Sequence, residues 1–236
     1  MVEKWLHLDF EAEGPWGYAI STAIQQAIKA GKVPPARRIL SQMPLHIHTR
    51  LSMLSRVVRR LHQECEALYE RVKKHNPEHV SRAGHKAFVF RVDDDLKYCL
   101  LADIDSFIFE IDACLDLFIN LNYMVHGHTG KNISRDESRK LLKNAAAAAG
   151  QGNGDPRWFH DLDRARNVFI HNATPYIAVD LSEEENNKYD LLIMRENLHE
   201  FSDESKFIRL SGLNNVGRCF FKAVPIFEKF IASLYG

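Results

Sequence analysis

The stretch RARNVFIHNATPYIAV, residues 164–179, decides the fold, because a helical pattern ends within it and a strand pattern begins. Apolar residues recur at helical spacing up to about His171, and Pro175 then interrupts the pattern. YIAVDL (176–181) and YDLLIM (189–194) both have the composition of β-strands, and the acidic loop SEEENNK separates them. The stretch therefore predicts a helix that leads into a small antiparallel sheet.

Outward from this stretch, most of the chain has the pattern of amphipathic helices. We predict helices at about 15–31, in a short segment opened by VPP at 33–35, at 45–74, at 95–124, after Ser134 with Glu137 as its capping box, from Asp155 to His171, and at 213–234, with strands at 4–10 and 86–92 and a loop at 126–133. The expected fold is mostly α, a helical bundle with a small antiparallel β-sheet appended (α+β). We expect one domain over 1–236, with an N-terminal strand and helices in 1–85 and a bundle core with a β insert in 86–236.

Composition limits the classes of protein to consider. Lysine plus arginine and aspartate plus glutamate both total 31, so nucleic-acid binding would need a local basic patch. The four cysteines form no C-x-x-C pair and lie in apolar helical segments, which indicates buried, reduced thiols. The N-terminus does not have the pattern of a signal peptide, and no apolar run is long enough to span a bilayer. We therefore expect a cytoplasmic protein with no membrane association.

The helix before His171 divides into an apolar stripe and a polar face when it is wound at 100° per residue from Arg166. The stripe contains Trp158, Leu162, Ala165 and Phe169. The polar face contains His160, Asp163, Arg164, Asn167 and His171. Arg166 lies at the border, where its stem can pack while its guanidinium reaches the polar face.

This grouping suits chemistry on a phosphodiester. A histidine exchanges protons near neutral pH, and an arginine fork holds a phosphate and stabilises developing charge. Asn167 could orient either group. The pattern supplies no metal-ligand set beside these residues and requires no cofactor, so it favours a metal-free reaction on RNA with the 2′-hydroxyl as nucleophile. The alternative is an ordinary solvated helix face. The pair His126 and His128 is too small a set for a metal site and is interpreted as part of a loop.

The segment RNVFIH, residues 166–171, resembles the R-x(4–6)-H signature of HEPN-domain proteins, in its Arg-Asn-x-x-x-His form. The resemblance implies a HEPN-like helical core over 86–236 and a homodimer in which two motifs share a cleft. Many family members are metal-independent endoribonucleases in defence, toxin–antitoxin or RNA-processing systems, while others bind or scaffold. Carried over, Arg166 and His171 are the catalytic pair and Asn167 is an auxiliary polar residue.

In this family a preceding long helix carries an acidic or polar residue towards the motif. The predicted helix at 95–124 has two acidic edges, Asp103 with Glu110, and Asp105 with Asp112 and Asp116. Asp163, Glu110 and Asp103 are the auxiliary candidates, and the alternative is that these acids only flank a helix. Toxins modified by nucleotidyltransferase antitoxins carry a tyrosine two residues after the motif histidine, where this chain has Ala173. The sequence therefore does not support an antitoxin partner of that kind.

Two functions of different class follow from the sequence. The first is a homodimeric HEPN-type ribonuclease that binds RNA. The second is a non-catalytic HEPN-like module that binds a nucleotide, RNA or protein; an Arg166 held in an internal ion pair together with a His171 closed into the core would favour it. Arg166 and His171 lie about 140° apart on an ideal helix, so a complete site calls for a second copy of the motif across a two-fold axis.

Overall fold

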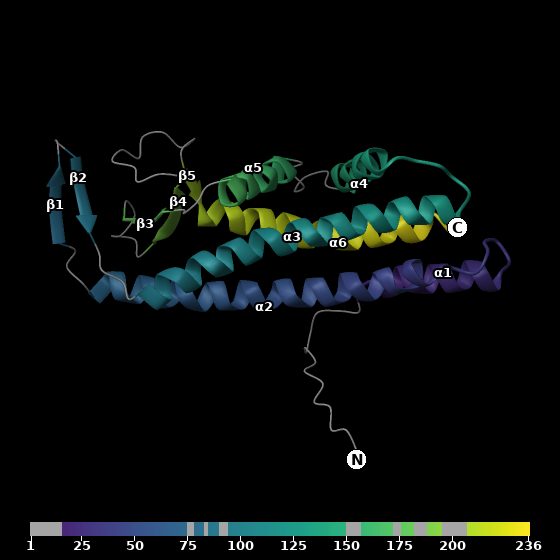
Figure 1. Ribbon diagram of the computed structural model, residues 1–236, viewed down its shortest axis with the longest axis horizontal. Helices are drawn as coiled ribbons and strands as arrows, with labels where there is room; N and C mark the ends of the chain where they lie inside the picture. Colours follow the sequence, from purple (N-terminus) through teal and green to yellow (C-terminus); the bar gives the residue numbers. More distant parts are fainter. Residues whose placement is uncertain are drawn as a thin grey trace, which may run out of the picture.

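The structure is a computed structural model that describes residues 16–74, 78–82, 85–89, 94–149, 157–171, 176–181, 188–194 and 207–236. It is a helical bundle with a two-stranded hairpin and a separate three-stranded antiparallel sheet. Figure 1 shows α3 and α6 between the long helix α2 on one side and the short helices α4 and α5 on the other. The predicted strand at 4–10 lies outside the described residues.

The first two helices form one side of the bundle. Helix α1, Tyr18–Lys29, stops two residues before Gly31, the glycine that was predicted to end it. The φ of Gly31 is 69°, a backbone conformation that suits a glycine. Helix α2, Arg38–Lys74, is a single helix, whereas the sequence predicted two. Pro44 lies inside it, only two turns from its start, and is buried. A proline so near the start removes one backbone hydrogen bond from the helix, and the burial of the first turns outweighs that loss.

The predicted strand at 86–92 is confirmed over its first residues as β2, His85–Val89. It pairs in antiparallel register with β1, Glu78–Arg82, with Arg82 paired to His85 and Glu78 to Val89. Strand β1 was not predicted, because EHVSR has a single apolar residue and carries little strand signal.

Helix α3, Asp94–His128, is longer than predicted and takes in three residues that were assigned to a loop, His126, Gly127 and His128. The buried residues Val125 and His126 extend its inner face beyond the predicted end, and the helix stops before Gly130, where φ is 80°. Helix α4, Arg135–Ala149, begins with the predicted capping box: Ser134 N–H donates to the Glu137 carboxylate, and Glu137 N–H donates to the Ser134 hydroxyl.

Helix α5, Arg157–His171, carries the motif and leads towards the sheet. Strands β3, Tyr176–Asp180, and β4, Asp190–Met194, pair in antiparallel register as predicted. A third strand, β5 at Phe207–Arg209, pairs with the other side of β4. The three residues of β5 are too few to show a period-two pattern, so this strand was not predicted. Helix α6, Leu210–Ser233, follows directly.

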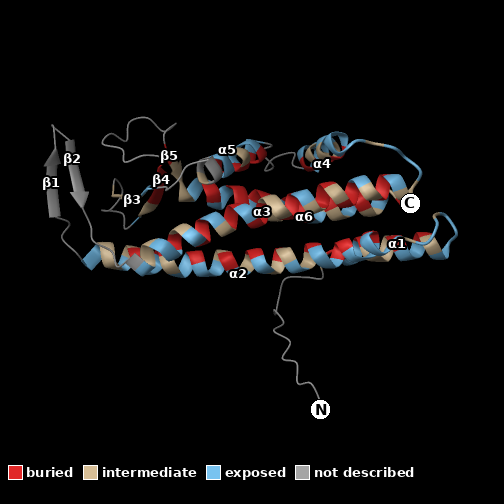
Figure 2. Ribbon diagram, in the orientation of Figure 1, coloured by how far each residue is buried: buried red, intermediate tan, exposed pale blue. Residues whose placement is uncertain are grey.

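The core runs along the centre of the bundle and is continuous from α1 to α6. Figure 2 shows buried residues on the faces of α2, α3 and α6 that point inwards. Aromatic contacts join the layers: Phe118 of α3 lies 5.4 Å from Phe227 of α6, and Trp158 of α5 lies 6.1 Å from Phe220 of α6, both between ring centroids. Burial of several large rings of this kind contributes a large share of the apolar stabilisation.

Three of the four cysteines are buried as predicted, namely Cys65, Cys114 and Cys219. Cys99 is exposed, because it lies on the outer face of α3 beside the exposed Tyr98. All four are free thiols. Burial raises the pKa of both Cys65 and Cys114 to about 12, so these two thiols stay protonated at neutral pH.

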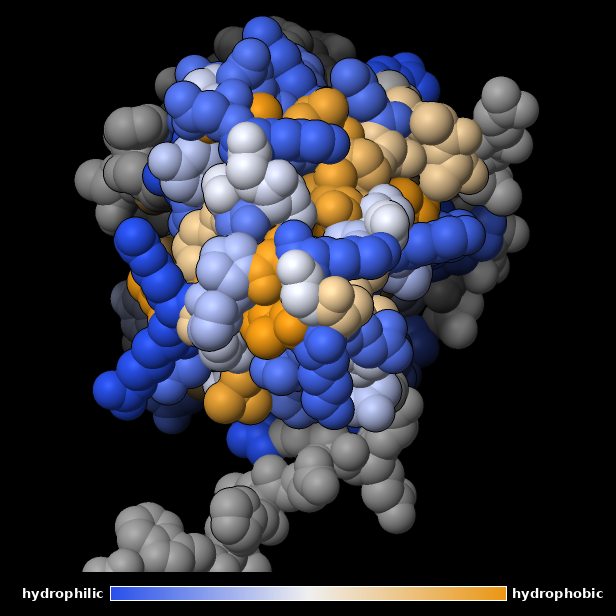
Figure 3. All heavy atoms as spheres, turned by 90° about the vertical axis from the view of Figure 1, so that its right-hand side faces the viewer, coloured by the Kyte–Doolittle hydropathy of each residue, from blue (hydrophilic) through white to orange (hydrophobic). Residues whose placement is uncertain are grey.

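The exterior of the bundle mixes charged and apolar side chains. Figure 3 views the end where α1 is joined to α2, and apolar atoms are visible there between charged side chains. Ile39, in the first turn of α2, is 61 % exposed. None of the helices that the structure describes combines the length and apolarity needed to span a bilayer.

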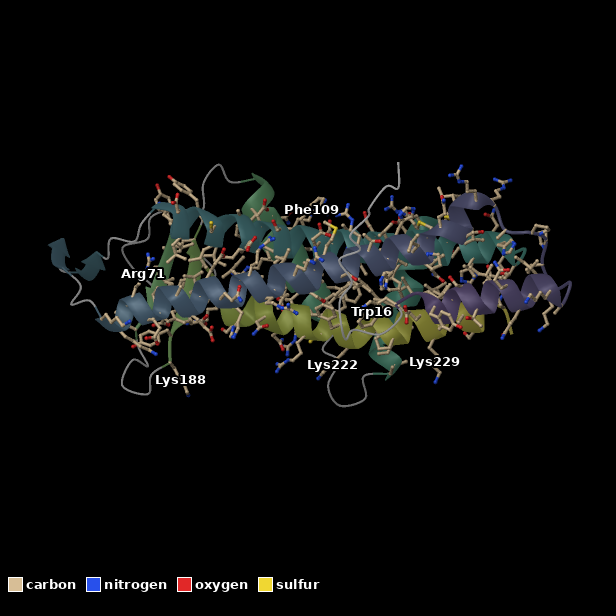
Figure 4. All side chains as sticks on the ribbon, turned by 90° about the horizontal axis from the view of Figure 1, so that it is seen from below. Trp16, Arg71, Phe109, Lys188, Lys222 and Lys229 are labelled. Atoms are coloured by element: carbon tan, nitrogen blue, oxygen red, sulfur yellow. The ribbon has the colours of Figure 1, made fainter. Side chains whose placement is uncertain are left out.

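Gly17 joins the start of α1 to the rest of the bundle. Its φ is 79°, and a Cβ added there would lie 2.6 Å from the Pro44 carbonyl oxygen. Its N–H donates to the Glu228 carboxylate of α6. The neighbouring Trp16 packs against Phe221 of α6, with 6.5 Å between ring centroids, and Figure 4 shows Trp16 alongside that helix.

We predict that Gly17→Ala lowers the free energy of unfolding by about 2–3 kcal/mol, because both the backbone conformation and the contact with Pro44 exclude a side chain. Gly31→Ala is the matched control, since Gly31 also has a positive φ but no atom within 4 Å of an added Cβ. It should cost only about 1 kcal/mol. Urea denaturation measures both, and equal losses would contradict the argument from close contact.

Candidate functional site

Helix α5 presents the predicted polar face to solvent. Trp158, Leu162 and Ala165 are buried, and Phe169 packs against the core, as predicted. On the other side His160, Arg164, Arg166 and Asn167 are exposed and Asp163 is half-buried. The amphipathic pattern alone sets this orientation, because burying the apolar stripe against α3 and α6 leaves the motif side outwards.

The motif arginine has an acidic partner on the preceding long helix. A guanidinium nitrogen of Arg166, Nη1, lies 3.3 Å from Oδ2 of Asp112 in α3. The Arg166 side chain is 47 % exposed and that of Asp112 is 18 % exposed. The carboxylate therefore holds the guanidinium from the protein side, while much of the guanidinium stays open to solvent.

The surroundings of Asp112 disfavour its charge. Burial raises the pKa of its carboxyl, and the neighbouring carboxylates of Asp116 and Asp163 raise it further. Arg166 and Arg139 act in the opposite direction, and the net pKa shift is upwards. Asp112 consequently takes up a proton more readily than an exposed aspartate, as is common for carboxyl groups in functional sites.

Asp163 connects the motif helix to α4. Its Oδ1 lies 3.3 Å from Nη2 of Arg139, and both side chains are about two-fifths exposed, at 42 % and 39 %. Asp163 is three residues before Arg166 and four before Asn167, so all three share one edge of α5. The structure thus places this predicted auxiliary residue beside the motif.

The other two auxiliary candidates lie elsewhere. Asp103 accepts from Arg60 of α2 at 2.6 and 2.9 Å, and Glu110 accepts from Arg50 of α2 at 2.7 and 3.0 Å. Both carboxylates are buried against α2, roughly 160–180° around α3 from Asp112. The structure does not bring Asp103 or Glu110 to the motif, and Asp112 occupies that place.

The sequence contains a signal that separates the two acidic edges. Helices α2 and α3 are long enough to pack side by side, and a row of arginines on one predicts a row of acids on the other. Arg50 and Arg60 supply that row, which leaves the edge of Asp112 and Asp116 for the remaining neighbours. Both acidic edges were predicted, but the edge of Asp103 and Glu110 was not paired with α2.

His171 is the last residue of α5, and its side chain lies outside the described residues. A scaffold would be favoured by an Arg166 held in an internal ion pair and a His171 closed into the core. The first condition is met in part, since Arg166 has an internal ion pair but remains half-exposed. The orientation of His171 stays a prediction. Asn167 is exposed on the same helix, one turn before His171.

The other histidines of the sequence analysis belong to the framework. The two ring nitrogens of His128 lie 2.8 Å from the Tyr235 hydroxyl and 2.8 Å from the Pro34 carbonyl oxygen. His126 is buried, and burial lowers its pKa. Within the described ranges, no group of three or more His, Cys, Asp or Glu side chains is arranged to hold a metal ion.

We predict that Asp112→Asn leaves the free energy of unfolding at pH 7 within about 1 kcal/mol of wild type, because removing a charge that is costly to bury offsets the lost ion pair. Asp103→Asn, the matched control, should lower it by about 1–2 kcal/mol, since Asp103 accepts two short bonds from Arg60.

The raised pKa of Asp112 also predicts how the stability difference between wild type and Asp112→Asn changes with pH. A folded-state pKa above the unfolded one means that Asp112 destabilises the native state increasingly as pH rises through that pKa. Wild type should therefore lose stability relative to Asp112→Asn as the pH increases from acid to neutral. Urea denaturation over that range measures the difference, and the opposite slope would contradict the assigned pKa direction.

Comparison with known proteins does not assign the chain to a family. No protein-family model, curated protein or solved structure matches the chain significantly. The likeness to HEPN proteins accordingly rests on the Arg166–His171 motif and its place in a helical bundle.

Proposed function

We propose that this chain is a HEPN-like, metal-independent endoribonuclease whose active residues are Arg166, Asn167 and His171. The observation that carries the proposal is the Arg166–Asp112 pair, in which an acidic residue of the preceding long helix orients a half-exposed motif arginine. A guanidinium has five N–H donors, and the contact with Asp112 occupies one nitrogen. Within the described part of the chain, the remaining donors are available to the two free oxygens of a phosphodiester.

The chemistry assigned to the site is internal transfer within RNA. The 2′-oxygen bonds to phosphorus and the bond from phosphorus to the 5′-oxygen breaks, which leaves a 2′,3′-cyclic phosphate and a 5′-hydroxyl. One proton leaves the 2′-hydroxyl and one is delivered to the 5′-oxygen, and His171 carries out proton transfer. Arg166 stabilises the charge on the phosphorane oxygens, and Asn167 orients the phosphate.

A homodimer would complete this site. One helix spreads Arg166 and His171 over an arc of about 140°, so a single copy does not focus both on one phosphate. A two-fold axis beside the exposed edge of α5 would place the partner's motif opposite and form a cleft with two arginines and two histidines. We place the enzyme in the cytoplasm, where free thiols such as Cys99 remain reduced and RNA is present.

A non-catalytic RNA-binding or scaffold module is the second candidate. The Arg166–Asp112 ion pair also favours this non-catalytic module, because Asp112 compensates the charge that a catalytic arginine would offer to a phosphate. The zero net charge of the chain also favours it, since no overall field attracts RNA. Cleavage assays separate the two candidates.

We predict that the wild-type protein cleaves single-stranded RNA in EDTA and that His171→Ala lowers the rate at least about a hundredfold, the usual contribution of a general acid–base. Arg166→Ala should have a similar effect through loss of charge stabilisation. His62→Ala is the control, because His62 is 73 % exposed on α2, outside the motif helix. Gel analysis of a labelled RNA measures the rates, and a wild type that cleaves no RNA at high enzyme concentration would establish the non-catalytic candidate.

We predict further that mixing Arg166→Ala and His171→Ala subunits restores part of the activity that each variant lacks. Each mixed dimer would contain intact groups from both chains in one cleft. Light scattering of the wild type should show a dimer at micromolar concentration. A monomer, or a mixture no more active than either variant alone, would contradict a composite site.

A further inference from the structure

Helix α4 carries a row of basic side chains along the side that faces the candidate site. Arg135, Arg139 and Lys143 are four residues apart, so they lie on one face, about 6 Å apart along the helix. Arg135 Nη2 lies 3.2 Å from Asp116 of α3, Arg139 Nη2 lies 3.3 Å from Asp163 of α5, and Lys143 Nζ lies 4.8 Å from the ring centroid of Phe159 in α5. We call these three residues the α4 row.

The α4 row is held in place by hydrogen bonds at the start of its helix. The Ser134–Glu137 capping box fixes the first turn. Ser138, next to Arg139, is buried; its hydroxyl donates to the Ile119 carbonyl at 2.7 Å and accepts from Asn122 at 2.9 Å. These bonds tie α4 to α3, so the backbone that carries the row is positioned before any ligand binds.

The contacts of the two row arginines leave donors unused. The arginines of α2 hold their carboxylates through paired bonds as short as 2.6 and 2.7 Å, whereas Arg135 and Arg139 each make, among the residues that the structure describes, one ionic contact of at least 3.2 Å. The Nε of Arg139 is buried and makes no hydrogen bond within the described part of the chain. A buried donor without an acceptor costs free energy, which an oxygen of a bound anion would recover.

The α4 row is continuous with the motif. Asp163 contacts Arg139 on one side, and Arg166 and Asn167 follow it by three and four residues on α5. Arg166 contacts Asp112 directly, Arg139 contacts Asp163, and the positive charges of both arginines lower the pKa of the Asp112 carboxyl. That carboxyl accepts a proton more readily than usual, and its protonation would leave the pair of arginines with an excess positive charge for an anion.

An exposed aromatic ring lies on the side of α3 that carries Asp112 and Asp116. Phe109 is 58 % exposed and three residues before Asp112, and Figure 4 shows it on α3. Arg50 lies over the ring at 5.8 Å from its centroid, and that arginine is itself held by Glu110. A fixed ring of this kind is a surface on which a nucleic-acid base can stack.

We propose that the α4 row and Phe109 form a binding surface for single-stranded RNA, with the row on the phosphates that flank the one at Arg166 and the ring on an unpaired base. The proposal rests on the ribonuclease site proposed above and names its substrate class. Evenly spaced cations suit the repeating phosphates of a strand, and stacking on Phe109 requires a base that is not paired in a duplex. An acidic protein partner would use the row but would gain nothing from the ring.

Binding is measured by fluorescence anisotropy of a labelled oligouridylate, with the full chain in a His171→Ala background so that the RNA stays intact. Arg139→Ala should weaken binding about tenfold and reduce the slope of log affinity against log salt by about one. Lys140→Ala, which removes the same charge from the exposed side of α4, is the control and should change neither. Equal effects of the two variants would overturn the role of the row.

Phe109→Ala provides a second variant that removes an exposed side chain and leaves the core unchanged. It should weaken binding about tenfold with no change in salt slope, because stacking is not ionic. Tyr98→Ala is its control, an aromatic residue 60 % exposed and about 21 Å away from Asp112 along α3. Failure of Phe109→Ala to weaken binding, or equal binding of the same sequence as a duplex, would overturn the single-strand assignment.

The two proposals fail in different ways. If the chain carrying an intact His171 cleaves no RNA but binds it through Arg139 and Phe109, the nuclease proposal is wrong and the binding surface stands. If it cleaves RNA while Arg139→Ala and Phe109→Ala bind like their controls, the nuclease stands and this surface is wrong. If the chain binds no RNA at all, the proposed binding surface is wrong.

Discussion

The burial of α3 among four other helices is the constraint on which the rest of the structure depends. It packs against α2, α4, α5 and α6, so most of its sides have a fixed neighbour, and one exposed side, which includes Phe109, remains. Its apolar residues, such as Phe118, fill the core, and its charged residues are sorted by the neighbour that each one meets. The position of α5, and therefore of the motif, follows from this sorting.

The two acidic edges of α3 show how the same residue type takes different roles. Asp103 and Glu110 meet long arginines from α2 in short bonds and act as clamps between two helices. Asp112 meets Arg166 at a longer distance, partly buried, with other carboxylates nearby. The first arrangement favours the folded state, whereas in the second burial disfavours the ionised form of the Asp112 carboxyl.

The sequence was sufficient for features that depend on local periodicity and capping. The apolar stripe of α5, the Ser134 capping box and the pairing of β3 with β4 all follow from residues close together in the chain. The continuity of α2 through Pro44 and the choice of Asp112 as the partner of Arg166 depend on contacts between residues far apart, which periodicity does not encode. Strands β5 and β1 were missed for a third reason, because neither gives a readable pattern: β5 has only three residues, and β1 contains a single apolar residue.

The distribution of the thiols has a practical consequence. Cys65, Cys114 and Cys219 are enclosed by the core, and Cys99 alone of the four lies at the surface. Since two of the enclosed thiols have pKa values raised to about 12, a maleimide dye at neutral pH reacts with Cys99 in preference to them. The native chain thus carries a selective attachment point near the start of α3, from which a fluorophore could report the approach of a second molecule without any engineered cysteine.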